Sequence, residues 1–380
     1  MIYLDNAATS YIKPENVLRT VCEATYKSSA NAGRGGYSAA IKSSEILYEA
    51  REKLSNVFGI DNPERIVFCK NTTEALNFGI KGVMSRGGHV ITTSMEHNSV
   101  IRPIKAMERS GVSCSVLQAD KDGNVDISKL EKMIKPQTKL IVMTHSSNVC
   151  GNIYDIEAVS KIARQNRVVF MVDAAQSAGS VPIDATYVDI LAFPGHKGLM
   201  GPMGTGGLYV RDGINVSSII EGGTGSLSES LTQPDFFPDM LESGTQNVPG
   251  VAGLGAACDF ILKNGIENIH NYEKSLRERF EEKVMNMDKI TIYGGAHKTA
   301  VTALNICGAD CVEVAERLAA EYDICVRAGL HCAILAHKSM GTEELGCVRF
   351  SFGYFNTPKE VDFTADALYK ISKDLQNCQN

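Results

Sequence analysis

Short apolar runs, each followed by a segment with helical character, recur from about residue 45 to residue 210. The strand-like runs lie at residues 65–68, 89–92, 139–143, 168–172, 188–192 and 207–210. Most of them are continuously apolar, which is typical of strands covered on both faces. Helix-like segments follow several runs, for instance at 73–83 and 156–164. This alternation predicts βα units around a mostly parallel sheet.

The pattern changes after about residue 262. A charged helix-like segment at 268–287 precedes a strand-like run at 290–293, and further helices are expected at 311–322 and after Pro358. These segments predict a separate, smaller α/β domain. The chain has 380 residues, of which 44% are hydrophobic, so it can bury the cores of two or three domains.

Charge and cysteine content exclude several classes of function. A net charge of −6 offers no basic face for a phosphodiester backbone, so we expect a small-molecule substrate and no nucleic-acid partner. The beginning of the chain lacks a secretory signal, and no apolar run approaches the ~18 residues of a membrane span. We therefore expect a cytoplasmic protein with no membrane partner. Eleven scattered cysteines indicate reduced thiols, and none has zinc-site spacing, so no metal is expected.

Two residues at successive strand ends suggest a cofactor. Asp173 ends the run at 168–172, where ligands of open α/β sheets lie, although an aspartate there can also cap a helix. Lys197 follows the next run, and alone it would be read as a surface residue. A lysine amine can form an imine with an aldehyde cofactor, and a carboxylate opposite a pyridine nitrogen keeps that nitrogen protonated. Together the pair predicts a pyridoxal 5′-phosphate (PLP) enzyme.

Two further segments have both a functional and a structural interpretation. The segment 71–74 (Asn-Thr-Thr-Glu) stands before a predicted helix, where a phosphate could bind, and it also fits a capping box. His97 follows the run at 89–92 and could stack on a cofactor or move protons. A single histidine at such a place is more often structural.

The ordered motifs resemble the class V aminotransferase family, and within it the group II, selenocysteine lyase-like cysteine desulfurases. The matching segments are residues 3–9, 34–37, 71–77, 96–99, 147–151, 173–177, 195–197, 242–247 and 348–352. The resemblance implies the PLP fold-type I architecture, an α/β fold whose large domain has a seven-stranded, mostly parallel sheet. We expect this domain at residues 16–262, and a smaller α/β domain formed by 1–15 and 263–380. The resemblance also implies a homodimer with active sites at the subunit interface.

The resemblance assigns roles around the cofactor ring. Lys197 would form the Schiff base, and Asp173 would pair with the pyridinium nitrogen. Gln176 would donate to the ring hydroxyl, and His97 would stack on the ring. Asn148 would lie near the ring and the substrate carboxylate.

The resemblance also implies how the two anionic groups are held. Thr72, Thr73 and His196 would bind the cofactor phosphate, joined by Thr245 from the partner subunit. Arg349 would clamp the substrate carboxylate with its planar fork.

Residues 327–333 (Arg-Ala-Gly-Leu-His-Cys-Ala) distinguish desulfurases from their relatives. The resemblance makes Cys332 the sulfur-accepting nucleophile, and the neighbouring arginine and histidine favour a thiolate. The alternative is a buried, inert cysteine, since ten other cysteines are present. In the implied reaction Lys197 removes the α-proton of L-cysteine. Cys332 then attacks the γ-sulfur, which leaves alanine and an enzyme persulfide for a protein sulfur acceptor.

Other functions stay open at this point. L-selenocysteine could be the substrate of a selenocysteine lyase, or a carbon–sulfur lyase or transaminase could use Lys197 without a persulfide. A non-catalytic carrier with a degenerate site is a third reading. The sequence departs from the family pattern at Pro194, where many relatives have a phosphate-contacting serine, and at Leu330, where a histidine is common. Residues 334–340 also differ from the usual continuation.

Overall fold

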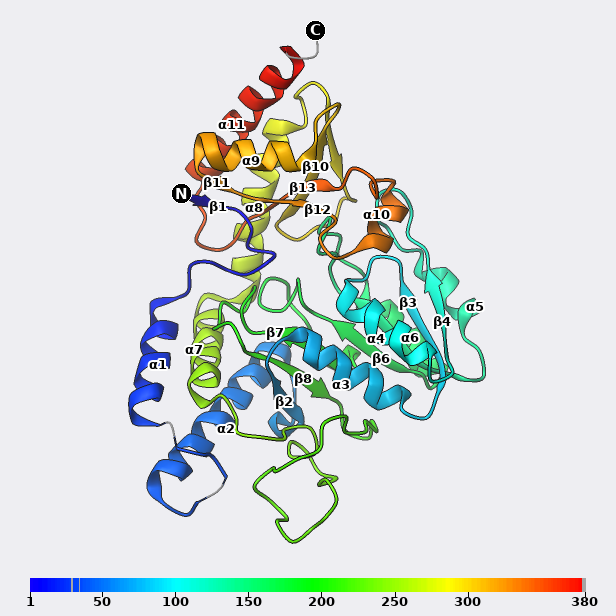
Figure 1. The fold of residues 1–380 in the computed structure, drawn as a ribbon, viewed down its shortest axis with the longest axis vertical. Coiled ribbons are helices and arrows are strands. Elements are labelled where there is room, and N and C mark those ends of the chain that lie inside the picture. The colour runs from blue at the N-terminus through cyan, green and yellow to red at the C-terminus, as the bar shows by residue number, and fades with distance from the viewer. Residues whose placement is uncertain (29, 34, 378–380) are drawn as a thin grey trace.

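A computed structural model describes residues 1–28, 30–33 and 35–377. Arg34, which belongs to one of the matching segments, lies outside the described residues. The chain forms two layered units with a junction between them (Figure 1).

A seven-stranded sheet is the centre of the larger unit, with the order β2-β8-β7-β6-β5-β3-β4. The strands are β2 (Ile66–Cys69), β3 (Gly88–Thr93), β4 (Val112–Leu117), β5 (Thr138–Thr144), β6 (Val169–Asp173), β7 (Ile190–Pro194) and β8 (Gly206–Val210). Only β8 runs antiparallel to its neighbours. The predicted seven-stranded, mostly parallel sheet is thereby confirmed.

Helices cover both faces of this sheet because alternate side chains of each strand point to opposite faces. In β2, Ile66 and Phe68 join one apolar core, whereas Val67 and Cys69 join the other. Helices α3 and α4 pack on one face, and α2, α6 and α7 on the other. The bounds are α1 (Glu15–Lys27), α2 (Ser38–Phe58), α3 (Thr72–Met84), α4 (Asn98–Glu108), α5 (Leu130–Met133), α6 (Ile156–Gln165) and α7 (Val248–Asn264).

The smaller unit holds an antiparallel sheet of order β12-β13-β10-β9 and a two-stranded parallel pair β1-β11. Its strands are β1 (Ile2–Tyr3), β9 (Ile290–Tyr293), β10 (Val301–Ile306), β11 (Ile324–Cys325), β12 (Arg327–Gly329) and β13 (Cys347–Ser351). Its helices are α8 (Ile266–Val284), α9 (Cys311–Tyr322), α10 (Ile334–Met340) and α11 (Pro358–Asn377). Since β1 pairs with β11, the beginning of the chain joins this unit, and Leu4 packs into its core with Phe280 and Phe350.

The sequence patterns located every strand of the larger sheet except β4, and the fold class is confirmed. Strand β4 was missed because its middle residues are only partly buried or exposed, so it lacks an apolar run. Strands β10 and β13 were not predicted as strands either. The proposed division of the chain near residues 15 and 262 stays a prediction. No helix among the described residues is long and apolar enough to cross a bilayer.

Candidate active site

The candidate site lies at the carboxyl ends of the central parallel strands, where ligands bind in open α/β sheets. Asp173 is the last residue of β6, and Lys197 follows the end of β7. Both line one pocket, whose lining residues all belong to the larger unit. The full lining is Asn71, Thr72, Thr73, Leu76, His97, Ser99, Thr144, Ser146, Asn148, Asp173, Ala175, Gln176, His196 and Lys197.

Asp173 is a buried carboxylate at the base of this pocket, 2% exposed. Its Oδ1 accepts a hydrogen bond from the amide of Ala175 over 2.9 Å. Burial raises the pKa of Asp173 to about 6, while the Ala175 amide and Lys197 act in the opposite direction. A cationic partner would compensate the buried carboxylate, because a nearby positive charge favours the ionised form.

Lys197 is held over the same pocket by a turn in which its carbonyl accepts from the amide of Met200 over 2.8 Å. The pKa of Lys197 is lowered to about 8, first by burial and then by the positive charge of Arg349, while Asp173 acts in the opposite direction. Roughly a tenth of this lysine is therefore an uncharged amine at pH 7, far more than for a lysine with the ordinary pKa of about 10.4. An uncharged amine can attack an aldehyde or accept a proton.

The start of α3 is both a helix cap and a wall of the pocket. The Asn71 side chain accepts from the amide of Glu74 over 3.0 Å, and the Glu74 carboxylate accepts from the amide of Lys70 over 2.7 Å. Thr72 and Thr73 line the pocket beside this cap. Hydroxyl groups at a helix N-terminus suit an anion. The structure shows the helix cap at residues 71–74, and phosphate binding stays a prediction.

His97 caps α4 and faces the pocket. Its Nδ1 accepts from the amide of Ser99 over 3.0 Å, so the neutral ring carries its proton on Nε2. Burial lowers the pKa of His97 to about 4, with Lys197 as the next cause. The neutral ring can stack on an aromatic ligand.

Gln176 and His196 connect the pocket to the beginning of the chain. The side-chain amide of Gln176 donates to the carbonyl of Ala7 over 3.0 Å. The Nδ1 of His196 lies 3.0 Å from Oγ1 of Thr9, and burial lowers the pKa of His196 to about 4. One N–H of Gln176 is used within the chain, and its second is left for a ligand.

Arg349 on β13 is not among the pocket-lining residues, but it contacts the pocket wall from the smaller unit through Asn148. It is 2% exposed, and its Nη1 donates to the main-chain carbonyl of Asn148 over 2.8 Å. Its Nη2 pairs with Asp5 over 2.8 Å, and its Nε has no hydrogen-bond partner among the described residues. The ion pair with Asp5 was not predicted, although Asp5 lies in the first matching segment. The two bonds fix the guanidinium beside the pocket wall, and binding of a substrate carboxylate by Arg349 stays a prediction.

Cys332 stands on an exposed turn of the smaller unit that touches the pocket. The carbonyl of His331 accepts from the side-chain amide of Asn148 over 2.7 Å. The carbonyl of Cys332 accepts from the amide of Asn98 over 2.7 Å. Cys332 is not among the pocket-lining residues, but its main chain is bonded to the pocket wall and to the start of α4.

Thr245 lies apart from this pocket, in the exposed segment between β8 and α7. Its expected contact was with the partner subunit's cofactor, so that role stays a prediction. Of the two departures, Pro194 is buried at the end of β7 opposite Gly206. Leu330 is 38% exposed beside the cysteine turn.

Glu96 is a buried acid beneath the pocket that the sequence did not single out. It is 1% exposed, and its Oε1 accepts from Thr93 Oγ1 over 2.6 Å and from the amide of Thr144 over 3.1 Å. Burial raises the pKa of Glu96 to about 8. Its position next to His97 in a matching segment was the available signal. Ser99, Thr144 and Ser146 also line the pocket and were not predicted.

The residues present fit PLP. A buried carboxylate matches the pyridinium nitrogen, a lysine of lowered pKa matches the aldehyde, and hydroxyl groups at the start of α3 match the phosphate. Fold and site together define an α/β enzyme of the PLP fold-type I class. The chain belongs to the class V aminotransferase family, whose family model matches residues 2–363. Enzymes of this family are PLP-dependent.

Similar proteins are named cysteine desulfurases. A probable cysteine desulfurase of Methanothermobacter thermautotrophicus is 36% identical over 98% of this chain and 94% of its own length. A cysteine desulfurase of Pectobacterium atrosepticum is 31% identical over 99% of this chain and 94% of its own. The apo structure of a cysteine desulfurase from Thermococcus onnurineus has a TM-score of 0.90 at 33% identity, covering 98% of this chain and 95% of its own.

Proposed function

We propose that this chain is a PLP-dependent cysteine desulfurase that converts L-cysteine to L-alanine and keeps the sulfur as a persulfide on Cys332. One observation carries the proposal. The turn with Cys332 is hydrogen-bonded to Asn98 and Asn148, at the wall of the pocket that contains Lys197 and Asp173. A nucleophilic thiol is thereby joined to a PLP site. The similarity to named cysteine desulfurases supports the same conclusion.

PLP, when bound, stabilises negative charge at the α-carbon of an amino acid. Asp173 supports this role because its carboxylate favours a positive charge at the ring nitrogen. Lys197 accepts the α-proton, since its lowered pKa supplies free amine near neutral pH. His97, held neutral, would stack on the ring and would pass a proton. Arg349 holds the substrate carboxylate beside Asn148.

Cys332 supplies the second half of the reaction. Its thiolate attacks the γ-sulfur of the substrate and forms an S–S bond, while the C–S bond breaks and its electron pair stays on the β-carbon. Protonation of that carbon leads to alanine. The persulfide then passes its outer sulfur to an acceptor thiol, which regenerates Cys332. An acceptor can approach because the Cys332 side chain is exposed.

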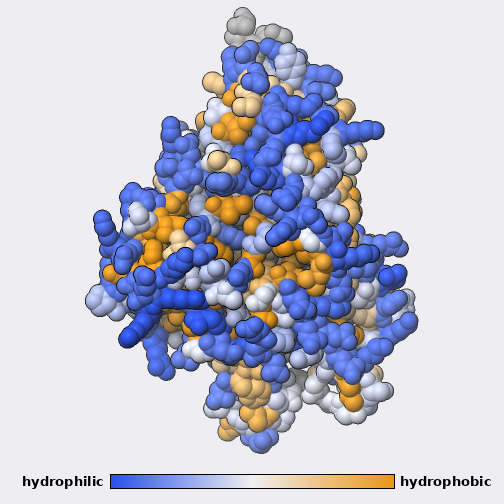
Figure 2. Space-filling model, turned by 180° about the vertical axis from the view of Figure 1, so that it is seen from behind, coloured by the Kyte–Doolittle hydropathy of each residue, from blue (hydrophilic) through white to orange (hydrophobic). Residues whose placement is uncertain are grey.

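The assembly we propose is a homodimer in the cytoplasm that transfers sulfur to an acceptor protein. Apolar side chains remain exposed on the reverse face of the molecule around a hollowed area (Figure 2). Exposed large apolar side chains include Tyr11 and Ile12 near the beginning of the chain and Leu231 and Phe236 near Thr245. A second copy of the chain would bury such side chains, and the role expected of Thr245 at the partner's site requires that copy.

The test measures alanine and sulfide from L-cysteine with a reductant, for the wild type and Cys332→Ala, with L-selenocysteine assayed in parallel. We expect the variant to lose cysteine turnover and the wild type to show a persulfide by mass spectrometry. Selenocysteine turnover that survives in the variant shows that the PLP chemistry is intact. Unchanged cysteine turnover in Cys332→Ala would instead make the chain a lyase without a persulfide.

A further inference from the structure

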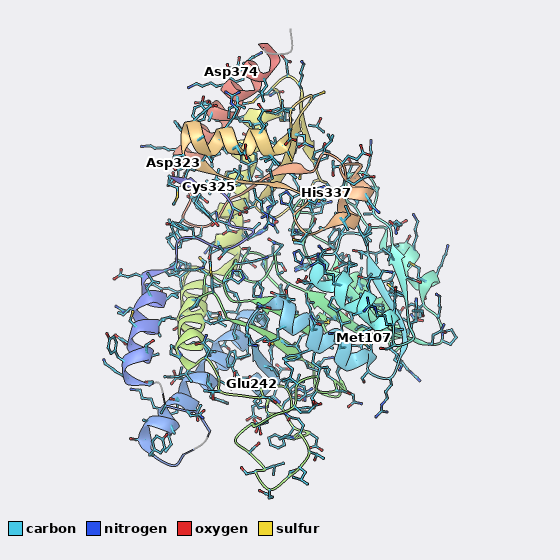
Figure 3. The ribbon with its side chains drawn as sticks, viewed as in Figure 1. Met107, Glu242, Asp323, Cys325, His337 and Asp374 are labelled. Atoms are coloured by element: carbon cyan, nitrogen blue, oxygen red, sulfur yellow. The ribbon has the colours of Figure 1, made fainter. Side chains whose placement is uncertain are left out.

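Two histidine rings lie against each other behind the Cys332 turn. His331 precedes the cysteine, and His337 comes from α10, which begins directly after the turn. Their ring centroids are 5.9 Å apart with an interplanar angle of 32°. The two residues are 4% and 0% exposed, respectively. Figure 3 places His337 on the side of the smaller unit that faces α4.

The turn itself has an unfavourable backbone. His331 and Cys332 have consecutive positive φ angles of 47° and 57°, a conformation that residues with a Cβ rarely adopt. Such a conformation persists only where its surroundings fix it. On the side of the larger unit, Asn148 and Asn98 donate to the carbonyls of the two residues.

On the opposite side, the turn is fixed through the His331 ring. Its Nε2 donates to the carbonyl of Cys347 over 3.1 Å, since a carbonyl oxygen can only accept. Burial lowers the pKa of His331 to about 2, so the ring stays neutral in this contact. The His337 ring lies beside the His331 ring, with a centroid distance of 5.9 Å. The Nδ1 of His331 has no hydrogen-bond partner among the described residues.

The His337 ring is held in one orientation. Its Nδ1 lies 2.7 Å from Oγ1 of Thr342, and its main-chain carbonyl accepts from the amide of Thr342 over 2.9 Å. Its own amide donates to Ala333, the first residue after Cys332, over 3.2 Å. A leucine of similar size would fill this space but could not be oriented by the threonine.

We propose that His337 is a positioning residue for Cys332, acting through the His331 ring. This inference rests on the proposed function, in which Cys332 attacks the substrate sulfur. His337 does not line the PLP pocket, so its removal should misplace the thiol without altering the chemistry at Lys197. Small displacements of a reacting group cost large factors in rate.

The experiment compares His337→Leu with the wild type in the PLP-loaded enzyme. We expect persulfide formation on Cys332 to slow by tenfold or more, on the order of the cost of misplacing a reacting group. The α-proton exchange of L-alanine in D₂O, which needs Lys197 but not Cys332, should be unchanged. In the PLP-free chain, the amide of Asn98 should exchange its hydrogen several-fold faster, because its acceptor is the carbonyl of Cys332.

Two further variants separate positioning from general destabilisation. Leu318→Ala removes a fully buried side chain of α9 from the core of the smaller unit and should lower the melting temperature without slowing persulfide formation relative to α-proton exchange. His337→Asn keeps a polar group that can reach Thr342, and it should recover part of the lost rate.

The outcomes are distinguishable. Equal slowing of persulfide formation and α-proton exchange in His337→Leu would overturn the inference, and so would unaltered exchange of the Asn98 amide. If the wild type itself forms no persulfide, the proposed function fails. The amide measurement then still decides whether His337 holds the turn.

Discussion

The main-chain amide of Asn98 donates a hydrogen bond to the carbonyl of Cys332 over 2.7 Å. Asn98 is the first residue of α4 and directly follows His97, which faces the pocket. The cysteine of the smaller unit is therefore fixed relative to the histidine of the larger unit through main-chain atoms. The separation between thiol and pocket depends on how the two units dock, and not only on the rotamer of Cys332.

The lowered pKa of Lys197 should appear in the pH dependence of PLP attachment. The amine attacks only when uncharged, and burial lowers its pKa to about 8. The rate of covalent attachment to the PLP-free chain should therefore rise from pH 6.5, reach half of its maximum near pH 8 and level off above about pH 9. Stopped-flow absorbance measures this rate. A rate that continues to rise toward pH 10 would contradict the lowered pKa, and Lys197→Ala should show no covalent attachment.

Arg349→Lys should weaken substrate binding and leave PLP bound. The arginine donates to Asn148 and pairs with Asp5 through two different nitrogens. A lysine has one compact ammonium group and cannot replace the planar guanidinium, whose nitrogens donate in fixed directions. We expect the affinity for L-alanine, used as a carboxylate-bearing probe, to fall by about 10- to 100-fold, the equivalent of one charge-assisted hydrogen bond. Titration of the visible absorption band gives the affinity. An unchanged affinity would mean that Arg349 has only a structural role.

The sequence pattern predicted most of the sheet and the places of Asp173, Lys197 and His97 because those features are local, whereas Asn148, Gln176 and His196 were expected only from the resemblance to the family. Buried parallel strands are apolar runs, and residues such as Asp173 and Lys197 follow them directly, so topology brings these residues together. Contacts between the two units could not be read in this way. The hydrogen bond from Asn148 to the His331 carbonyl joins segments that are distant in the sequence. It depends on the positive φ angles of His331 and Cys332, which a histidine and a cysteine do not predict.

The buried pair of Arg51 and Glu242 should be a main support of the larger unit, and Figure 3 labels Glu242 in that unit. The two side chains lie 2.6 Å apart, and Glu242 also accepts from the amide of Phe68 over 2.7 Å. Glu242→Ala leaves the arginine buried without a counter-charge, which costs about 3–5 kcal/mol of unfolding free energy. Urea unfolding of the PLP-free chain measures the loss.

A double variant tests the origin of this loss. Arg51→Met with Glu242→Leu removes both charges and should recover most of the stability, because no charge is then left unpaired. As a matched control, Glu157→Ala removes the partner of Lys161 in an exposed pair and should change stability by less than about 1 kcal/mol. If the double variant is as unstable as Glu242→Ala, packing and not charge is responsible.

Glu96→Gln should stabilise the PLP-free chain at pH 8 but not at pH 5. Burial raises the pKa of Glu96 to about 8 from an ordinary value of 4.5. Between these values the folded chain binds a proton that the unfolded chain lacks, so the free energy of unfolding falls as pH rises. Glutamine is neutral at every pH and keeps the oxygen that accepts from Thr93 and Thr144. The other carboxyl oxygen, Oε2, has no hydrogen-bond partner among the described residues, so none is lost.

We expect the variant to gain on the order of 2–4 kcal/mol over the wild type at pH 8, from about 1.4 kcal/mol for each unit of pKa shift. At pH 5 the difference should be small. Urea unfolding at a series of pH values gives the stability difference at pH 5 and at pH 8. Glu157→Gln, at an exposed site, serves as the control. A stability difference that does not grow between pH 5 and pH 8 would show that Glu96 is ionised in the folded chain and is held by its hydrogen bonds from Thr93 and Thr144 as a carboxylate.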